Sequence, residues 1–390
     1  MAYKKNGIWL TALAILTAAV IWVLACTPRA APVPLAVPNT GSVTGSTSTP
    51  MAQVPGTNPA EADWAKVVSA AQKESQLTIY SDRASGDTWK NLVDVFTARY
   101  GVKVQGIAGR GAELLERMKV EQRTGQAVAD LIISGPTSSV AVSKEGFTSS
   151  LLDLPEVRQQ DIWISSPAYD PQALVLFFSI TPPFFPVVNT KLVKPDDEPR
   201  TWQDLLQPRW KGQILMDDPS VTGGGNIWTG LSLEYKIFDM AYLEKLARQD
   251  VVLTRNYTEA FTMIGTGERA MALAQPLHQT FVSFVVKGAP LKAVDLKDGG
   301  VTSAYVVNMV KKPAHLNAAR LFANWLLTEE GQTTWSREMQ YWPIRKGVSV
   351  ATHPSLVFKN PTKIVVPTLE DNEAIVKYVR EGSIAKLFKK

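Results

Sequence analysis

The sequence has few of the residues that build metal centres and covalent catalytic sites. Its 390 residues include one cysteine and three histidines. A single cysteine excludes an internal disulfide framework and a zinc site made of cysteines. The histidines, His278, His315 and His353, lie far apart in the sequence and lack metal-ligand spacing. There is also no cue for a Ser-His-Asp arrangement. We therefore expect no enzyme, no cofactor and no metal site.

The sequence also lacks a strong excess of charge of either sign. The net charge is +5, the sequence pI is about 9.0, and charged residues make up 20% of the chain. These charges are spread out, and no basic stretch interleaved with aromatic residues suggests a nucleic-acid partner. What the chain does have is 45% hydrophobic residues over a length that favours two domains with a large core.

The N-terminal segment has the composition of a targeting signal. Lys4 and Lys5 precede an apolar run over residues 8–25, which ends at Cys26. Residues 23–26 resemble the lipobox of bacterial lipoproteins, in which the cysteine is lipidated and becomes the mature N-terminus. The run is also long enough to remain as a membrane anchor. Both alternatives place the rest of the chain outside the cytoplasm and tether it to the membrane.

A flexible tether is expected between this segment and the folded part. Residues 27–60 consist largely of Pro, Ser, Thr, Gly and Ala. Such a composition cannot bury enough apolar surface to offset the entropy lost on ordering. We therefore predict a signal segment over 1–26, a tether over 27–60 and a folded part from about residue 61.

Strands alternate with helices in the first folded segment. Strands are predicted over 77–80, 102–107 and 129–135, with helices over 87–100 and 112–124. This alternation favours an α/β fold with a parallel sheet, and such sheets bind ligands beyond the carboxyl ends of their strands. The loops at these ends carry the candidate binding residues Ser81, Asp82, Arg83, Arg110, Ser134 and Gly135.

A proline-broken apolar segment, residues 174–190, divides the chain into two lobes. Its prolines exclude a regular central strand across its whole length. We expect residues 174–180 to leave the first lobe, residues 186–189 to enter the second, and residues 301–310 to return. The predicted lobes are therefore 61–182 plus 301–340, and 183–300 plus 341–390.

A glycine-rich stretch in the second lobe is the most distinctive local pattern. A run of strand length at 212–216 leads into an acidic turn, three consecutive glycines and a predicted helix from about Asn226, which Ser220 or Thr222 could cap. A strand, a glycine turn and a helix start together present free backbone N–H groups that suit an anion. The alternative is an ordinary turn whose glycines only permit tight packing.

Longer motifs around this stretch resemble a known family. Asn189-Thr190 followed by EPRTWQDLLQPRWKGQILMDDPS resembles the central signature of type II periplasmic solute-binding proteins, within the ferric-ion, thiamine and phosphorylated-sugar group. HLNAARLFANWLLTEEGQ and QYWPIRKGV resemble the late helix and exit segment of that group. The resemblance covers most of the chain from about residue 61. It implies two α/β lobes joined by hinge crossovers, a ligand between them and delivery to an ABC-type permease.

The resemblance also implies which residues contact the ligand. It assigns contacts to the loops at 81–83 and 134–135 and to the helix start at Thr222, Gly223 and Gly224. Iron-binding members carry adjacent tyrosines where this sequence has Gln275-Pro276-Leu277-His278, so the oxygen cage for Fe³⁺ is incomplete. Gln275 and His278 become ligand candidates instead. A small phosphorylated or phosphonate compound, or another organic anion, fits the guanidinium groups of Arg83 and Arg110 better.

Each candidate also has a purely structural alternative. The arginines could pair with surface carboxylates, the serines could make local turn bonds, and His278 could cap a helix. Tyr305 and Tyr341 could face the cleft from hinge segments, but core packing is favoured for both. Trp228, Trp325 and Trp335 are expected in the core. The predicted function is that of a monomeric, extracytoplasmic solute-binding component of an ABC transporter. The alternatives are a ferric-iron or iron-chelate binding protein of the same family and a tethered sensory receptor.

Overall fold

The computed structural model describes residues 59–109, 111–159, 161–164, 167, 170–221, 223–356, 358, 364–365 and 371–388. The predicted signal segment, Cys26 and almost all of the predicted tether lie outside this part of the chain. Asp63–Lys390 forms one compact unit that contains both sheets described below. Within the described residues, no helix has the length and apolar character needed to cross a bilayer.

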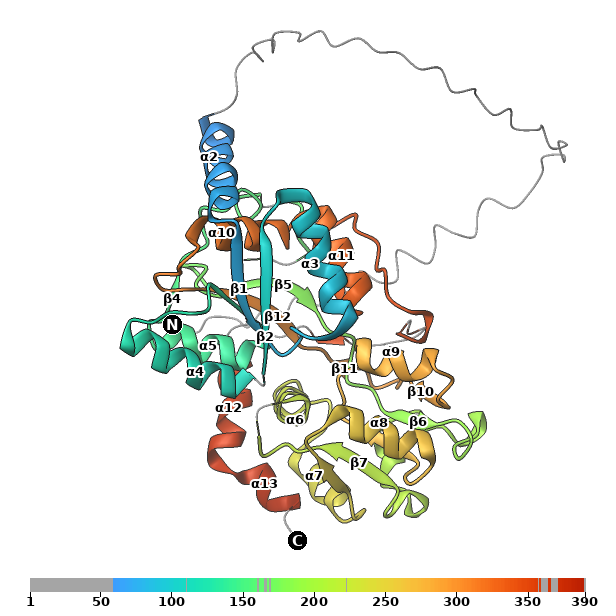
Figure 1. The fold of residues 1–390 in the computed structure, drawn as a ribbon. Helices are drawn as coiled ribbons and strands as arrows, with labels where there is room; N and C mark the ends of the chain where they lie inside the picture. Colours follow the sequence, from blue (N-terminus) through green and yellow to red (C-terminus); the bar gives the residue numbers. More distant parts are fainter. Residues whose placement is uncertain are drawn as a thin grey trace, which may run out of the picture. The chain divides into compact units, whose positions relative to one another are not determined.

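The first lobe is built on a mixed sheet with the order β13-β5-β12-β3-β1-β2, and β4 pairs with β12 (Figure 1). Its strands are β1 (Gln76–Ser81), β2 (Lys103–Ala108), β3 (Leu131–Ser134), β4 (Thr148–Ser149), β5 (Leu176–Ile180), β12 (Ala304–Val310) and β13 (Trp342–Pro343). Only β2, β1 and β3 are parallel. Strand β12 runs antiparallel to β3 because it returns from the second lobe, so the predicted parallel sheet holds for these three strands alone.

The second lobe repeats this arrangement in a sheet with the order β10-β6-β9-β7-β8. Its strands are β6 (Val187–Asn189), β7 (Ile214–Asp217), β8 (Val252–Thr254), β9 (Met271–Leu273) and β10 (Leu291–Ala293). Strands β8, β7 and β9 are parallel, and β6, which arrives from the first lobe, runs antiparallel to β9. A separate parallel pair joins β11 (Gly300–Val301) to β14 (Ile364–Val365).

Helices surround both sheets (Figure 1). The α-helices are α2 (Pro59–Glu74), α3 (Gly86–Tyr100), α4 (Gly111–Thr124), α5 (Pro136–Lys144), α6 (Gly224–Glu234), α7 (Met240–Ala247), α8 (Tyr257–Thr266), α9 (Gln279–Val286), α10 (Leu316–Trp325), α11 (Glu329–Met339), α12 (Asp371–Glu381) and α13 (Ser383–Phe388). Short 3₁₀ helices span Pro195–Asp197, Trp202–Leu206, Pro208–Trp210 and Pro354–Leu356. Helix α5, which follows β3, is absent from the sequence-based prediction.

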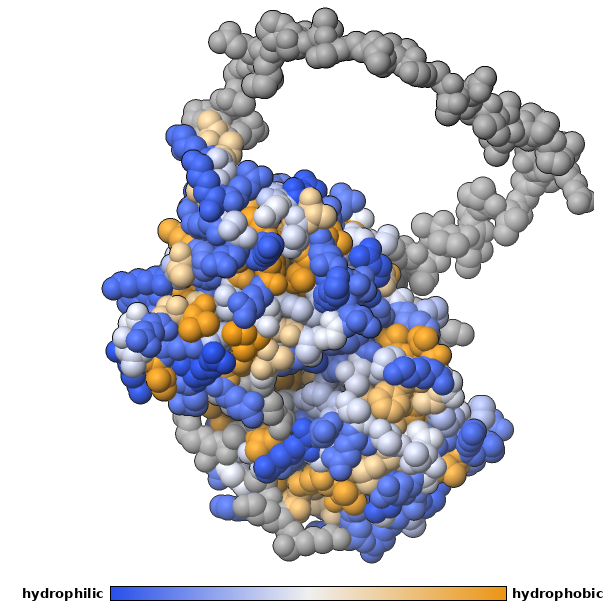
Figure 2. Space-filling view, viewed as in Figure 1, coloured by the Kyte–Doolittle hydropathy of each residue, from blue (hydrophilic) through white to orange (hydrophobic). Residues whose placement is uncertain are grey.

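Each lobe has its own hydrophobic core. The first contains Trp325 and Trp335, and the second contains Trp228; these side chains are 0%, 1% and 0% exposed. The predicted core positions of the three tryptophans are therefore confirmed. On the face shown in Figure 2, hydrophilic residues cover most of both lobes and hydrophobic residues form separate patches. Burial of large side chains at about 1.5–3 kcal/mol each makes these cores the main source of stability.

Two of the crossovers between the lobes run side by side. The N–H of Thr181, just after β5, donates to the carbonyl of Ser303 over 2.8 Å, and the N–H of Ser303 donates to Thr181 Oγ1 over 2.8 Å. The N–H of Phe184 donates to the carbonyl of Val301 over 3.0 Å. The segments predicted to leave and re-enter the first lobe are thus the crossovers, and their mutual hydrogen bonds satisfy backbone groups buried between the lobes.

Candidate ligand-binding cleft

A cleft of about 680 Å³ lies between the lobes. Its walls come from the loops after the parallel strands of both sheets, together with the crossovers. The first lobe contributes Asp82, Arg83, Gly109, Ser134, Gly135, Thr137 and Ser138, and the second contributes Val221, Gly223, Gly224, Arg255, Tyr257, Pro276 and Thr280. The carboxyl ends of both parallel sets therefore face one cavity, as ligand-binding α/β sheets require.

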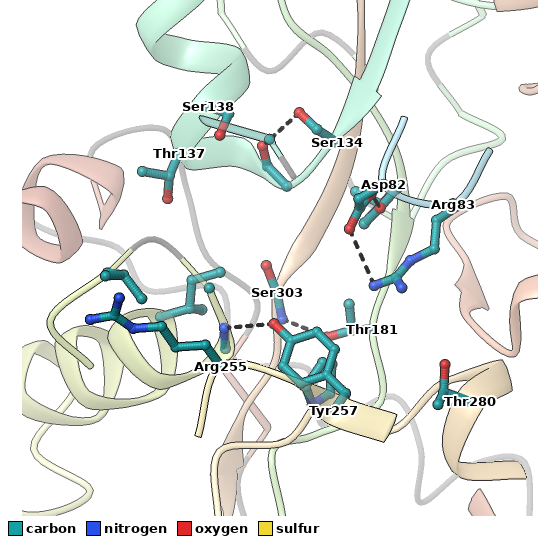
Figure 3. Close-up of a pocket in the computed structure, with 18 of the residues that line it drawn as sticks. Asp82, Arg83, Ser134, Thr137, Ser138, Thr181, Arg255, Tyr257, Thr280 and Ser303 are labelled. Atoms are coloured by element: carbon teal, nitrogen blue, oxygen red, sulfur yellow. Dashed lines mark hydrogen bonds and ion pairs between the residues drawn. The ribbon is translucent and has the colours of Figure 1, made fainter. Parts of the chain in front are cut away.

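The turn after β1 places a charged pair in this cleft (Figure 3). The hydroxyl of Ser81 accepts a hydrogen bond from the N–H of Arg83 over 3.1 Å, and Ser81 is fully buried. Ser81 thus forms a local turn bond beneath the wall of the cleft. Asp82 and Arg83 project beyond it into the cavity, so the role of Ser81 here is to shape the turn that presents them.

Among the described residues of the cleft, Arg83 is the most deeply buried charge. Its side chain is 9% exposed, and its Nη2 lies 3.4 Å from Asp82 Oδ2. The guanidinium carbon is 5.8 and 5.9 Å from the ring centres of Tyr305 and Tyr341, which is cation–π range. Its buried Nε has no hydrogen-bond partner among the described residues. Arg83 is therefore a fixed cation in the cleft wall with donor capacity left over.

The surroundings of Arg83 keep it charged and keep the nearby phenols neutral. Burial alone would lower the pKa of Arg83, but Asp82 and the hydroxyls of Tyr305, Tyr341 and Tyr257 outweigh it and raise that pKa well above its usual value. Burial raises the pKa of Tyr305 well above its usual value and that of Tyr341 to about 12, although Arg83 opposes both shifts. At neutral pH these tyrosines are hydroxyl donors rather than phenolates.

Tyr305 and Tyr341 combine a core position with a place in the cleft. They are 3% and 0% exposed, which confirms the expectation of core packing, and both also line the cavity. The hydroxyl of Tyr305 donates to Asp82 Oδ1 and so fixes the carboxylate of the charged pair. Tyr305 lies in β12 and Tyr341 follows α11, so tertiary packing within the first lobe brings both side chains to the β1 turn.

The start of α5 supplies backbone donors to the first-lobe wall. Gly135 is the N-cap in an extended conformation, Pro136 follows in the first turn, and no side chain of the described residues caps the helix. The hydroxyl of Ser134 is hydrogen-bonded to Ser139 over 2.8 Å instead. The first N–H groups of a helix have no partner within the helix, so Thr137 and Ser138 present theirs at the positive end of the helix dipole.

The start of α6 faces the cleft from the second lobe, but its donors are occupied. The N–H of Gly223 donates to Asn226 Oδ1 over 2.8 Å and that of Gly224 to the hydroxyl of Tyr257 over 3.3 Å. The N–H of Gly225 donates to Asp217 Oδ2 over 2.7 Å, and Asp217 is fully buried. A carboxylate of the protein itself thus satisfies this helix start.

The glycines of this turn are needed for close packing. A Cβ atom on Gly224 would lie 2.4 Å from the carbonyl oxygen of Ala274, and one on Gly225 would lie 2.2 Å from that of Asp217. Gly223 and Gly224 do line the cavity. The predicted cap is corrected: Gly223 is the N-cap, while Ser220 bonds to Asp218 over 2.6 Å. Thr222 lies outside the described residues.

The loop after β8 adds a second arginine and a tyrosine to the second-lobe wall. Nε and Nη2 of Arg255 both lie 2.8 Å from Asp218 Oδ2, and this side chain is 59% exposed. Tyr257 lines the cavity below Ser303 in Figure 3 and is hydrogen-bonded to the backbone of Gly224. Burial and the nearby Asp217 raise the pKa of Tyr257. Both arginines are paired with a carboxylate, but Arg255 is largely solvated whereas Arg83 is buried.

Gln275 and His278 lie behind the second-lobe wall. Both are fully buried, and the neighbouring Pro276 and Thr280 line the cavity instead. His278 Nδ1 accepts from the N–H of Thr280 over 3.1 Å and caps α9, which places its proton on Nε2. Burial, followed by the charge of Arg83, lowers the pKa of His278 well below its usual value. The remaining predicted arginine, Arg110, lies outside the described residues.

Sequence reasoning missed several residues of the cleft. Thr137, Ser138, Thr181, Tyr257 and Ser303 line it without having been predicted. A signal existed for the first two, because Gly-Pro followed by small hydroxyl residues is typical of a helix start with proline in the first turn. No local signal marks Thr181 or Ser303, which meet only where the two crossovers run together.

Comparison with known proteins identifies the family. The profile of bacterial extracellular solute-binding proteins matches residues 77–338, which is more than half of the chain. The chain therefore belongs to this family, as its two-lobed fold and interlobe cleft suggest.

Individual relatives differ in the solute that their names give. A Salmonella typhimurium protein described as "Putative 2-aminoethylphosphonate-binding periplasmic protein" is 24% identical over 295 residues, which cover 71% of this chain and 81% of that protein. Iron-bound HitA from Pseudomonas aeruginosa has a TM-score of 0.63 at 18% identity and covers 78% of this chain and 98% of its own.

AfuA from Actinobacillus pleuropneumoniae, solved with fructose-6-phosphate, has a TM-score of 0.64 at 20% identity and covers 80% of this chain and 97% of its own. At these identities the structures establish the shared fold. The solute of this chain has to be argued from its own cleft.

Proposed function

We propose that this solute-binding protein captures a small organic anion, of the organophosphonate or phosphate-ester class, and releases it unaltered to an ABC-type permease. The observation that carries this proposal is Arg83, a buried permanent cation in the wall of an interlobe cleft. A relative named for 2-aminoethylphosphonate and a neighbour solved with a sugar phosphate support the same class of ligand. Closure of the lobes about their crossovers would bury the bound solute.

The oxyanion group is proposed to bind the first-lobe wall. Arg83 offers a planar guanidinium suited to phosphonate or carboxylate oxygens, and the uncapped start of α5 offers the N–H groups of Thr137 and Ser138. The start of α6 is a poorer site for an anion. The Asp217 carboxylate already accepts a hydrogen bond from the N–H of Gly225 and offsets the positive end of the helix dipole. Gly223, Gly224 and Tyr257 would then contact uncharged parts of the solute.

Ferric iron suits this cleft less well. Fe³⁺ requires hard anionic oxygen ligands, and phenolates are the form in which tyrosine would supply them. Burial raises the pKa values of Tyr257, Tyr305 and Tyr341, and the adjacent Arg83 would repel a trivalent cation. The same Arg83 attracts an anion, so the charge arrangement favours the organic-anion proposal over the iron alternative.

The domain arrangement and anchoring are part of the proposal. A lipidated Cys26 or an uncleaved apolar segment within 1–26 would tether the protein, with 27–60 as a spacer. The lobes would comprise 61–182 with 301–340, and 183–300 with 341–390, with the correction that β13 (Trp342–Pro343) pairs with β5 in the first-lobe sheet. We propose that the protein acts as a monomer outside the cytoplasm. Its relatives are transport components, which favours binding without chemical conversion of the solute.

Isothermal titration of the folded part against a solute panel tests this function. The panel contains phosphonates, phosphorylated sugars, thiamine and ferric citrate. We expect a phosphonate or phosphate ester to bind with a Kd in the micromolar range or below, about −8 kcal/mol. Binding of ferric citrate alone, or of no solute below about millimolar concentration, would contradict the proposal.

A further inference from the structure

The carboxylate of Asp82 stands directly beside the proposed oxyanion site. Its side chain is 32% exposed and lines the cleft next to Arg83 (Figure 3). The buried hydroxyl of Tyr305 donates to one of its oxygens and fixes its orientation. Its other oxygen lies 3.4 Å from Arg83, which is longer than a typical charged hydrogen bond. A carboxylate has about four lone-pair sites, so Asp82 keeps acceptor capacity toward the cavity.

The charges around Arg83 suit an anion that also carries a cationic group better than a bare anion. Among the described lining residues, the two arginines are matched by two acids, Asp82 and Glu113. Arg255 is in addition paired with Asp218 at 2.8 Å. An anion beside Arg83 therefore also faces the negative charge of Asp82, and this repulsion works against its binding.

We infer that Asp82 is a specificity-determining residue that selects solutes carrying a cationic amino group next to their oxyanion. Such a zwitterion can align antiparallel to the Asp82–Arg83 pair, with its oxyanion on Arg83 and its ammonium on Asp82. This inference rests on the proposed function, because it concerns the same cleft. The hydrogen bond from Tyr305 holds the carboxylate in place before the solute arrives, which reduces the ordering cost of binding.

A ligand pair that differs only in the amino group tests this directly. Isothermal titration would compare 2-aminoethylphosphonate with ethylphosphonate on the wild-type protein and on Asp82→Asn. The wild type should bind the amino compound at least about tenfold more tightly, and Asp82→Asn should reduce this preference to below about threefold. Asp87→Asn is the matched control, because it removes the same charge from an exposed site at the start of α3 and should preserve the preference.

The outcomes separate this inference from the proposed function. If the wild type binds ethylphosphonate as tightly as the amino compound, the selection by Asp82 is wrong and anion capture still stands. If neither compound binds, this inference fails, and the solute panel described above decides whether anion capture fails with it. If Asp82→Asn weakens both ligands equally, Asp82 acts only by orienting Arg83 and the inference is overturned. Even if circular dichroism shows that the variant does not fold, a wild-type ratio near one overturns the inference.

Discussion

Two helix starts border the cleft, and they differ in whether a side chain accepts hydrogen bonds from their first N–H groups. Helices α5 and α6 both follow a buried parallel strand and point their N-termini at the same cavity. At α6 the N–H of Gly225 is held by the carboxylate of Asp217, whereas at α5 no side chain in the described part of the chain caps the helix. One lobe therefore neutralises its helix dipole internally, and the other is proposed to leave it for a ligand.

This difference shows that a glycine-rich strand–turn–helix does not by itself identify an anion site. The glycines of α6 let its backbone pass within contact distance of Ala274 and Asp217. The less conspicuous Gly135 of α5 has open space around it, because a Cβ atom there would meet no atom of a described residue beyond its chain neighbours within 4 Å. The role of each turn depends on whether a side chain of the same lobe already accepts hydrogen bonds from its N–H groups.

The largest expected effect is the loss of Arg83. Arg83→Gln removes the buried cation from the first-lobe wall and should weaken organophosphonate binding by about 2–5 kcal/mol, roughly 30-fold or more. Arg255→Gln on the second lobe removes an exposed cation paired with Asp218, so its effect should stay within about 1 kcal/mol. Titration calorimetry on both variants measures the contrast, and equal losses would remove the distinction between the two walls.

The two glycines should differ sharply in their tolerance of a methyl group. Gly225→Ala would place a Cβ atom 2.2 Å from a backbone oxygen and should lower the free energy of unfolding by about 1–3 kcal/mol or more. Gly135→Ala meets open space at φ −66° and should stay within about 0.5 kcal/mol. Urea unfolding of the pair measures this, and similar stabilities would show that α6 is not closely packed.

The internal anion of α6 should contribute measurably to stability. Asp217→Asn keeps the shape of the buried side chain and removes the charge that faces the Gly225 N–H. We expect the free energy of unfolding to fall by about 1–2 kcal/mol, the range for a partly buried charge at a helix N-terminus. If thermal and urea unfolding were unchanged, the charge of the Asp217 carboxylate would not stabilise the start of α6.

The smallest effect concerns pH. Burial alone would raise the pKa of Asp218, but hydrogen bonds from Ser220 and Arg255 outweigh it and hold this pKa below its usual value. A lowered folded-state pKa stabilises the protein above about pH 4, and this stabilisation is lost as the pH falls through the lowered value.

Asp218→Asn should therefore reduce stability by about 1 kcal/mol or less at pH 7, with a smaller difference from the wild type near pH 3. Unfolding curves at both pH values measure it. A difference that grew on acidification would contradict the sign of this pKa shift.

Much of the fold was predictable because hydrophobic periodicity reports local structure. Trp89, Leu92, Val93 and Phe96 share one face of the predicted helix over 87–100 and are the buried residues of α3. The two crossovers were also predicted, because prolines interrupt the apolar segment between β5 and β6. The antiparallel direction of β12 was not predicted, because it follows from the return of the chain from the second lobe and not from any local sequence pattern.

The site was predictable only where a strand end marked it. Asp82, Arg83 and Gly135 line the cleft because they follow β1 and β3, as the position of strand ends indicates. The three glycines at the start of α6 are a more conspicuous sequence pattern than the start of α5. Nothing local distinguishes an N–H group that is free from one held by Asp217, eight residues earlier in the chain. Tyr305 likewise reaches Asp82 only through tertiary contact across more than two hundred residues.

The central claim is that the solute's oxyanion binds the first-lobe wall, and a crystal structure with a bound organophosphonate tests it most directly. We predict phosphonate oxygens within about 3 Å of the Arg83 guanidinium and of the Thr137 or Ser138 backbone nitrogen, with Asp217 still bonded to Gly225. Phosphonate oxygens seated on the N–H groups of Gly223–Gly225, with Asp217 displaced and Arg83 not contacting the ligand, would contradict the account.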